Sequence, residues 1–497
     1  MKKSIQTNNN KKKKNNRNSN TNNKSKKTNN KKTNHDLNSS PEWWISQAEE
    51  AMQSLDVSKA CEYYQQAVSL LLLQQKQQDE EIEMETTSTT SSSLKSLLAS
   101  TLTQLAECKV SLGDVDGARE DFEQALEFTL QEKQYEEKNH GNPLRAALYL
   151  SIGQLCLADE ARLAYEQGIL EYETLVRHDN NTTRDILPNE EQQREDWKSS
   201  LARAHCAIAE LYLTDLCDVD TAEQQCEYHV QSAMKVCDPP ILDALQVLTS
   251  LRLSQRNSTS LQDMTNPTTY IWTVYQHMKQ GCEALSALVG LHNSEAMLLS
   301  STDNDDEDDI ESSEDAAKEL VELEAVEQLP SFEFRCQTSK LLLECAVWAE
   351  ESIHIPCVHA AIQVLGSLLA EQDEVIEIWY LVGCAFELLT RSLLSSSSTS
   401  SSTTTIHELS DLSKYYWQRA LEMLEKVQEQ LGIEMENIDN DEDEEDDQYR
   451  DELLQQLNQC ECQMEEIRHK LESIDESVDG KEEDNKTDMP DDVMDVE

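Results

Sequence analysis

The 497-residue sequence is poor in the residues that interrupt helices. It contains 11 glycines and 9 prolines, and only 5% of its residues are aromatic. Glycine and proline are the residues least compatible with a helix interior, whereas alanine, leucine, glutamine and glutamate favour it. A strand-rich protein would need more turn residues and more aromatic side chains. The composition therefore predicts an almost wholly helical protein.

Several segments that would indicate a membrane, a secretory route or a catalytic chemistry are absent from the sequence. No run of about 18 apolar residues occurs, so we expect no membrane span. The N-terminus is rich in lysine and asparagine, which does not resemble a secretory signal. The glycine-rich nucleotide-binding loops, the HExxH zinc motif and the GxSxG nucleophile motif are missing. We therefore predict a protein that is not an enzyme and that uses no cofactor.

Fourteen cysteines are present, but no two of them form a CxxC pair. A free thiol within an apolar helical run packs as a small hydrophobe in a reducing compartment. Seven cysteines lie in such runs: Cys61, Cys108, Cys156, Cys206, Cys226, Cys345 and Cys384. Cys460 and Cys462 form a CxC near His469, which is weak support for zinc. For His205 and His229, each close to a cysteine, we expect packed or solvent-facing side chains, and we predict no metal site.

The formal net charge of -55 is unevenly distributed. Residues 1–40 carry twelve basic side chains and one acidic one, so the remaining chain carries a net charge of -66. Such a body repels nucleic acid and anionic membranes and attracts basic proteins. Acidity that serves only solubility remains the alternative. For residues 1–40 we favour a nuclear import signal over weak nucleic-acid contact or a low-complexity tail.

From Pro41 onward the sequence repeats a two-helix pattern. In tetratricopeptide (TPR) repeats the second helix carries small, aromatic and small residues at spacings of four and three, and the small residues let paired helices cross closely. Two stretches carry this spacing: Ala60, Tyr64 and Ala67 in one, and Ala118, Phe122 and Ala125 in the next. Twelve residues earlier, a small residue occurs in the preceding helix in both cases, Ala48 and Ala106. The predicted fold class is all-α, a TPR-like helical-repeat solenoid.

The domain boundaries follow from shifts in composition. We predict that residues 41–435 form the solenoid, and that low-complexity segments are loop insertions between its helices. These insertions are 79–93, 256–268, 303–312 and 395–405. The number of repeats between 256 and 330 stays open, because the apolar periodicity there is patchy.

Both ends of the chain differ from the solenoid. We predict a disordered basic tail over residues 1–40 and, after an acidic run at 436–447, a helix over 448–474. Its apolar residues alternate at spacings of four and three, as in a coiled-coil seam. For so short a helix we favour packing onto the last repeat over self-association. Residues 475–497 are predicted to be an acidic, disordered tail.

The charge and the repeat together suggest how the solenoid binds. Stacked helix pairs leave a long concave face lined by first helices, in which an extended peptide can lie. Surrounding carboxylates favour a lysine- or arginine-rich partner. From repeat phase alone, the candidate binding residues are Glu107, Tyr149, Glu210 and Tyr212. Docking of an acidic chaperone tail, the competing TPR function, needs a lysine and an asparagine where this sequence has Ile45 and Glu49.

Five stretches carry a more specific resemblance. They are Tyr149–Ile169 (YLSIGQLCLADEARLAYEQGI), Ala207–Leu216 (AIAELYLTDL), Asp243–Gln255 (DALQVLTSLRLSQ), Phe332–Leu343 (FEFRCQTSKLLL) and Ile378–Phe386 (IWYLVGCAF). Together they resemble the fungal TPR proteins that act as the dedicated assembly chaperone of large-subunit ribosomal protein four. The resemblance spans roughly residues 41–425, in the family's order.

This resemblance implies a non-catalytic chaperone. Such a protein would capture the newly made ribosomal protein by its long basic internal loop, keep it soluble and release it on nuclear pre-60S particles. We would then expect it in the cytoplasm and the nucleus, with import machinery as a further partner. We expect neither direct nucleic-acid binding by the body nor membrane association. The alternative is a TPR scaffold or adaptor in another pathway.

Overall fold

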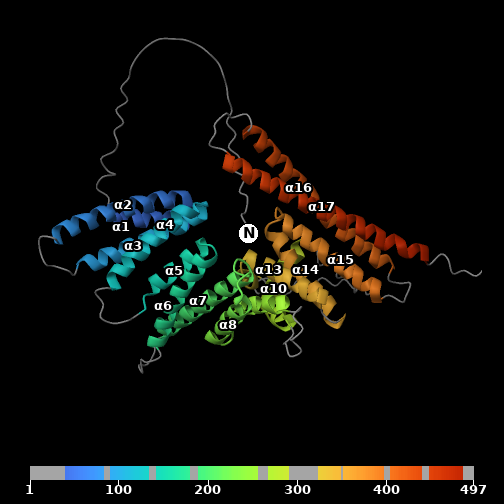
Figure 1. Cartoon of the computed structure of the whole chain (residues 1–497), viewed down its shortest axis with the longest axis horizontal. Coiled ribbons are helices and arrows are strands. Elements are labelled where there is room, and N and C mark those ends of the chain that lie inside the picture. The colour runs from blue at the N-terminus through green and yellow to red at the C-terminus, as the bar shows by residue number, and fades with distance from the viewer. Residues whose placement is uncertain are drawn as a thin grey trace, which may run out of the picture. The chain divides into compact units, whose positions relative to one another are not determined.

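The computed structural model describes residues 40–82, 90–133, 141–179, 188–255, 267–289, 323–348, 351–396, 403–438 and 447–484. Within these ranges every regular element is a helix and no strand is present (Figure 1). The all-α helical-repeat fold predicted from the composition is confirmed. Most of the basic tail, of the predicted insertions 256–268 and 303–312 and of the acidic run lies outside the described residues. Helix occupies part of the other two predicted insertions, since it continues to Ile82 and resumes at Thr90, and continues to Ser396 and resumes at Thr403.

The helices fall into two compact units, Met1–Glu132 and Lys133–Glu497, whereas the sequence analysis treated residues 41–435 as one array. The first unit contains α1 (Pro41–Gln53), α2 (Val57–Ile82), α3 (Thr90–Leu112) and α4 (Val115–Lys133). The second contains α5 (Pro143–Leu155), α6 (Ala158–Asp179), α7 (Pro188–Leu213), α8 (Ala222–Val236), α9 (Leu242–Ser254), α10 (Pro267–Leu288), α13 (Phe332–Trp348), α14 (Glu351–Glu371), α15 (Ile376–Ser396), α16 (Thr403–Ile438) and α17 (Asp447–Asp484).

In the second unit, consecutive helices pack as pairs. α5 packs on α6, α7 on α8, α9 on α10, α13 on α14 and α15 on α16. The first helices of neighbouring pairs also contact one another, α7 with α9, α9 with α13 and α13 with α15. Such contacts place these first helices side by side in a row, as stacked helical pairs require. This row positions the candidate binding residues of the second unit.

The residues predicted at the helix crossings of the first unit are buried. Ala48, Ala60, Ala67, Ala106, Ala118 and Ala125 are all 0% exposed, and the aromatic residues between them, Tyr64 and Phe122, are 2% exposed. The turn between these two helices is short, because α3 ends at Leu112 and α4 begins at Val115. Gly113 makes the reversal with φ +84°, a conformation that suits glycine. The Asp114 carboxylate accepts a hydrogen bond from the Gly117 amide and caps α4.

Glycines take the small crossing position at two pairs of the second unit. A methyl group added at Gly153 of α5 would lie 2.8 Å from Tyr165 Cε1 of α6. A methyl group at Gly383 of α15 would overlap the indole of Trp417, which is fully buried on α16. The indole Nε1–H donates to the Tyr380 carbonyl at 3.2 Å and so fixes the ring. Each aromatic ring therefore fills the space left by a missing side chain.

Two apolar helices, α14 and α15, belong to one core cluster of the second unit. By length and composition, Ile353–Glu371 and Ile376–Ser395 are each able to cross a membrane, although the sequence analysis expects no span. In the structure 67% of the first segment and 50% of the second are buried among other helices. Leu365, Leu368 and Phe386 belong to that cluster. Their apolar composition serves the interior of the array here.

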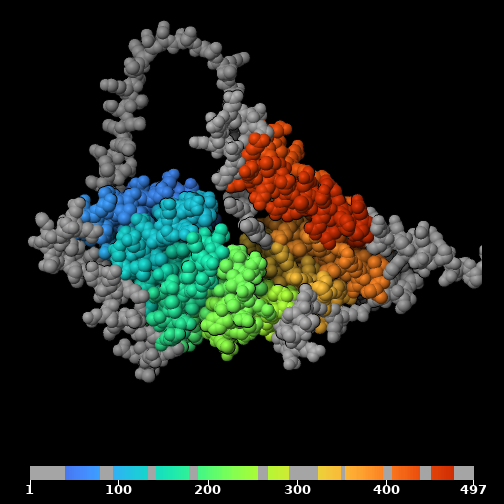
Figure 2. All heavy atoms as spheres, viewed as in Figure 1, coloured from blue at the N-terminus to red at the C-terminus, as the bar shows by residue number. Residues whose placement is uncertain are grey.

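The last helix packs along its predecessor. Cys460, Met464 and Ile467 of α17 form one cluster with Trp417 and Leu424 of α16. Figure 2 shows α16 and α17 as one continuous red surface. The helix predicted over 448–474 lies within α17, which continues to Asp484, so it also takes in the first residues of the predicted acidic tail.

We predict opposite effects of alanine at two helical glycines. Gly383→Ala would drive a methyl group into the Trp417 ring and lower the free energy of unfolding by about 1–3 kcal/mol. Gly432→Ala on α16 meets nothing within 4 Å and raises it by about 0.5–1 kcal/mol, because alanine favours the helix. Urea unfolding monitored by circular dichroism measures both. Equal effects of the two substitutions would contradict the proposed crossing.

Candidate binding surface on the first helices

An acidic pair lies where two first helices meet in the second unit. Glu210 of α7 directly follows Ala209, which is fully buried in the cluster that α7 forms with α8 and α9. The Glu210 side chain is therefore turned away from that cluster and is exposed. Asp243 lies in the first turn of α9 and is half-buried. The two carboxylates are close enough for Asp243 to perturb the ionisation of Glu210.

The surroundings of Glu210 disfavour its charged form. Displacement of water by neighbouring protein, with added repulsion from Asp243, raises the pKa of the Glu210 carboxyl to about 7. The Glu210 side chain is nevertheless exposed, so a partner can reach it. Tyr165 of α6 lies nearby, and burial followed by the charge of Glu210 raises its pKa to about 12. Within the described part of the chain, neither Glu210 nor Asp243 forms an ion pair.

At the corresponding position between α13 and α15, an acidic side chain is paired with a basic one. Lys340 follows the fully buried Ser339 on α13, as Glu210 follows Ala209 on α7. Glu377 lies in the first turn of α15, as Asp243 does in α9. Lys340 and Glu377 form an ion pair. Between α7 and α9, an acidic residue, Glu210, thus takes the place that the lysine has between α13 and α15.

Tyr212, His205 and His229 form a cluster of neutral rings between α7 and α8. Tyr212 of α7 stacks on His229 of α8 with ring centroids 6.4 Å apart. The Nδ1 atoms of His205 and His229 are 3.0 Å apart, so one ring donates and the other accepts. Burial, reinforced by His229 for His205 and by Arg162 for His229, lowers both pKa values to about 4. Both histidines are buried and neutral near pH 7.

The cysteines do not assemble with these histidines into a metal site. Among the described residues, no group of three or more His, Cys, Asp or Glu side chains is arranged to hold a metal ion. Cys206 and Cys226 are buried, and burial raises the pKa values of both thiols. Of the CxC pair, Cys460 is buried and Cys462 is exposed. What this surface offers to a partner is the charge of the exposed Glu210 and the half-buried Asp243.

The four residues predicted from repeat phase lie on three helices, α3, α5 and α7. Glu107 is exposed on α3 of the first unit and accepts a hydrogen bond from Gln104 Nε2 at 3.1 Å. Tyr149 is half-buried on α5, where burial and then the charge of Glu171 raise its pKa. Glu210 and Tyr212 share α7 but project differently, because residues two apart lie about 200° apart around a helix.

Asp243 is not among the residues predicted from repeat phase. It lies about one repeat length, or about 34 residues, beyond Glu210. It also opens one of the stretches that carry the family resemblance. Acidic residues that recur at repeat spacing are the sequence signal of such a pair.

We predict that Glu210 makes stability depend on pH. Its folded-state pKa is raised to about 7, so between about pH 4.5 and pH 7 the folded state binds more protons than the unfolded state. The free energy of unfolding contributed by this group therefore falls as the pH rises through that window. Glu210→Gln should flatten the profile of urea unfolding between pH 5 and pH 8, whereas Glu461→Gln, at an exposed site on α17, should leave it unchanged. Parallel profiles for wild type and Glu210→Gln would contradict this assignment.

Comparison with known proteins gives one informative relative. No family model matches the sequence. A curated protein of Schizosaccharomyces pombe (strain 972), described as "Probable assembly chaperone of rpl4", is 26% identical over 324 residues. The matched region covers 65% of this chain and 73% of the relative. The resemblance to assembly chaperones of large-subunit ribosomal protein four, predicted from five stretches of sequence, is confirmed by this similarity.

Proposed function

We propose that this chain is a dedicated assembly chaperone of a basic ribosomal protein, the counterpart of rpl4. The observation that carries the proposal is the uncompensated carboxylate pair Glu210–Asp243 on neighbouring first helices, in a chain similar over most of its helical array to a chaperone of that description. A lysine- or arginine-rich segment of the client supplies the missing positive charge. The chain acts by binding, without catalysis.

The raised pKa of Glu210 gives this binding a physical basis. Without a partner, the Glu210 carboxyl binds a proton more readily than an ordinary glutamate does, because its pKa is raised. A cationic side chain placed between Glu210 and Asp243 favours the ionised form of both groups and lowers the pKa of Glu210. Binding of the client is therefore coupled to release of a proton. It also relieves the repulsion between the two carboxylates.

Shielding follows from the chemistry of the client. Free ribosomal proteins bind nucleic acid through their basic segments, and this binding depends on contacts with phosphates. A body with a net charge of -66 competes with the phosphate backbone for the same segments. The chaperone thus keeps the client soluble until a specific RNA site on the pre-60S particle displaces it.

The site of action follows from that client. Ribosomal proteins are made in the cytoplasm and join large-subunit precursors in the nucleus, so we propose that the chain works in both compartments. The basic tail over residues 1–40 is then the segment to which the import machinery binds. The acidic body repels nucleic acid, so release depends on the affinity of the client for the particle.

The first test is affinity capture of the full-length tagged chain from fungal lysate at low and at high salt. We expect the counterpart of rpl4 to be retained at low salt and released at high salt, because screening weakens contacts between charges. Mass spectrometry identifies the captured proteins. Failure to retain any ribosomal protein would refute the proposed function, and salt-insensitive capture of other proteins would favour an adaptor whose acidity serves solubility.

We predict that the acidic pair contributes more to client binding than the acidic run does. Reversing both charges with Glu210→Lys and Asp243→Lys should weaken binding by about tenfold or more, because like charges then face the client. Deleting residues 441–447 should have a smaller effect. The matched control is Glu461→Lys with Glu465→Lys, two exposed positions on α17. Isothermal titration calorimetry with the captured client measures each affinity, and an equal loss from the deletion would make the acidic run the main contact.

A further inference from the structure

A cavity of about 570 Å³ lies elsewhere in the second unit. Its walls come from the C-terminal ends of α10 and α14 and from the sides of α15 and α16. The main lining residues are Leu288, Leu369, Asp373, Trp379, Tyr415 and Tyr416. Leu288 is 77% exposed and Tyr415 is 55% exposed, so the cavity opens to solvent through large apolar side chains. It is separate from the Glu210–Asp243 pair, which lies between α7 and α9.

Three aromatic rings form one side of this cavity. The Trp379 ring centroid lies 5.6 Å from that of Tyr416 and 6.5 Å from that of Tyr415. The Trp379 Nε1–H donates to the Asp373 carbonyl at 2.7 Å, and Tyr416 stacks on Phe386 at 5.6 Å. Two of the three rings are thus held in place by contacts behind the cavity. Ring faces that are fixed and reached by solvent suit the binding of a cation.

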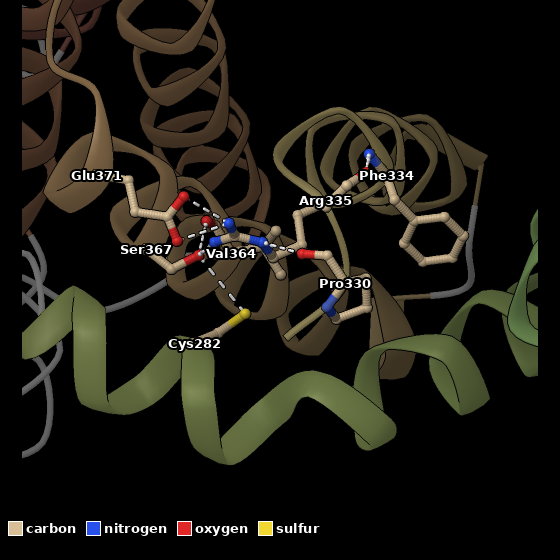
Figure 3. A network of polar contacts seen from close by, with 8 residues as sticks. Cys282, Pro330, Phe334, Arg335, Val364, Ser367 and Glu371 are labelled. Carbon is tan, nitrogen blue, oxygen red and sulfur yellow. Dashed lines mark hydrogen bonds and ion pairs between the residues drawn. The ribbon is translucent and has the colours of Figure 1, made fainter. Parts of the chain in front are cut away.

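The two carboxylates of the cavity differ in their partners. Glu371 accepts hydrogen bonds of 2.6 and 2.7 Å from the buried Arg335, which also donates to Ser367 Oγ and to the Pro330 carbonyl at 3.0 Å each (Figure 3). The charge of Glu371 is therefore neutralised within the fold. The exposed Asp373 carboxylate forms no ion pair or hydrogen bond with any residue of the described ranges. One negative charge beside the aromatic wall is left for a partner.

We propose that this cavity binds an arginine side chain of a basic partner protein. Its guanidinium group lies against the Trp379, Tyr415 and Tyr416 rings and donates hydrogen bonds to the Asp373 carboxylate. The basic client of the proposed function is the source of this arginine, so the inference rests on that function for its partner. It assigns a second contact, at a distance along the array from the acidic pair.

Arginine fits the cavity better than lysine or an apolar side chain. A guanidinium group is planar and weakly hydrated, stacks on aromatic rings and matches a carboxylate with paired donors, whereas an ammonium group is compact and strongly hydrated. An apolar occupant would cover Asp373 and leave its charge without a partner, which is costly. The chain already contains one such contact, because the Arg419 guanidinium lies 5.7 Å from the Trp379 ring centroid. The net charge of -66 on the body also favours a cation.

The first test observes the cavity without any client. Full-length chain labelled with 5-fluorotryptophan is examined by fluorine NMR, and Trp379→Phe identifies the resonance of Trp379. We expect the acetylated and amidated peptide Gly-Arg-Gly to shift this resonance saturably. The matching citrulline peptide, which has the shape but not the charge, should leave it in place. Asp373→Asn should weaken the binding of the arginine peptide at least threefold.

Other outcomes of this titration would overturn the inference. Equal shifts from the citrulline peptide or from Gly-Leu-Gly would indicate an apolar site, and no shift from any peptide would indicate no side-chain site. Tighter binding of Gly-Lys-Gly than of Gly-Arg-Gly would contradict the role of stacking. Circular dichroism verifies that Asp373→Asn retains its helices, and the exposed turn position of Asp373 makes this the expected result.

The second test uses the captured client. Asp373→Asn combined with Tyr415→Ala should weaken client binding by about 3- to 30-fold, the range expected for loss of a partly desolvated cation–π contact and its charge partner. The matched control, Glu374→Gln with Tyr449→Ala, changes an exposed acid and an exposed tyrosine outside the cavity and should leave the affinity unchanged. Equal losses in both double variants would overturn the inference.

The two proposals fail in different ways. If no ribosomal protein is captured but the arginine peptide still shifts the Trp379 resonance, the proposed function is wrong and the arginine site stands. If the client binds but the peptide produces no shift and the cavity variants bind normally, the site is wrong and the function stands.

Discussion

The close crossing of paired helices, with an aromatic ring filling the space of a missing side chain, is the contact on which the array depends. At Gly383 the indole of Trp417 lies where a methyl group would have to be, and at Gly153 the ring of Tyr165 does the same. These crossings fix how far each first helix is rotated about its axis. On α7 the residue after the buried Ala209 is Glu210, which is exposed. A packing constraint thereby decides which side chains a partner can reach.

Much of this framework was predictable because it depends on contacts within one repeat. The small residues Ala60 and Ala118 proved fully buried, as their spacing indicated. Contacts between repeats were not predictable, since spacing within a repeat carries no information about its neighbours. The cavity lined by Leu288, Leu369, Trp379 and Tyr416, for example, takes residues from four helices of different pairs. The pairing of Glu210 with Asp243 escaped prediction for the same reason.

An apolar helix can be either a membrane span or a central helix of a stacked array. α14 and α15 are apolar enough to meet a membrane criterion, yet much of each is buried because helices pack against them on several sides. A helix in the middle of a stacked array loses the polar face that a surface helix keeps. Composition alone therefore could not separate a membrane span from a central helix. The contacts of α14 with α10, α13 and α15 supply the distinction in this structure.

A carboxylate with an ion-pair partner stabilises the fold, whereas a carboxylate without one is available to a partner protein. Removing one partner of a buried ion pair is strongly destabilising, so Glu371 and its partner Arg335 are needed by the fold. Glu210 and Asp373 have no such partner in the described ranges, and burial, with added repulsion from Asp243, raises the pKa of the Glu210 carboxyl. A carboxylate that lowers the stability of the free chain gains most when a cation arrives, since binding removes the penalty. By this argument we expect a basic client to be recognised at the least satisfied acidic groups of an acidic protein rather than at its longest acidic run.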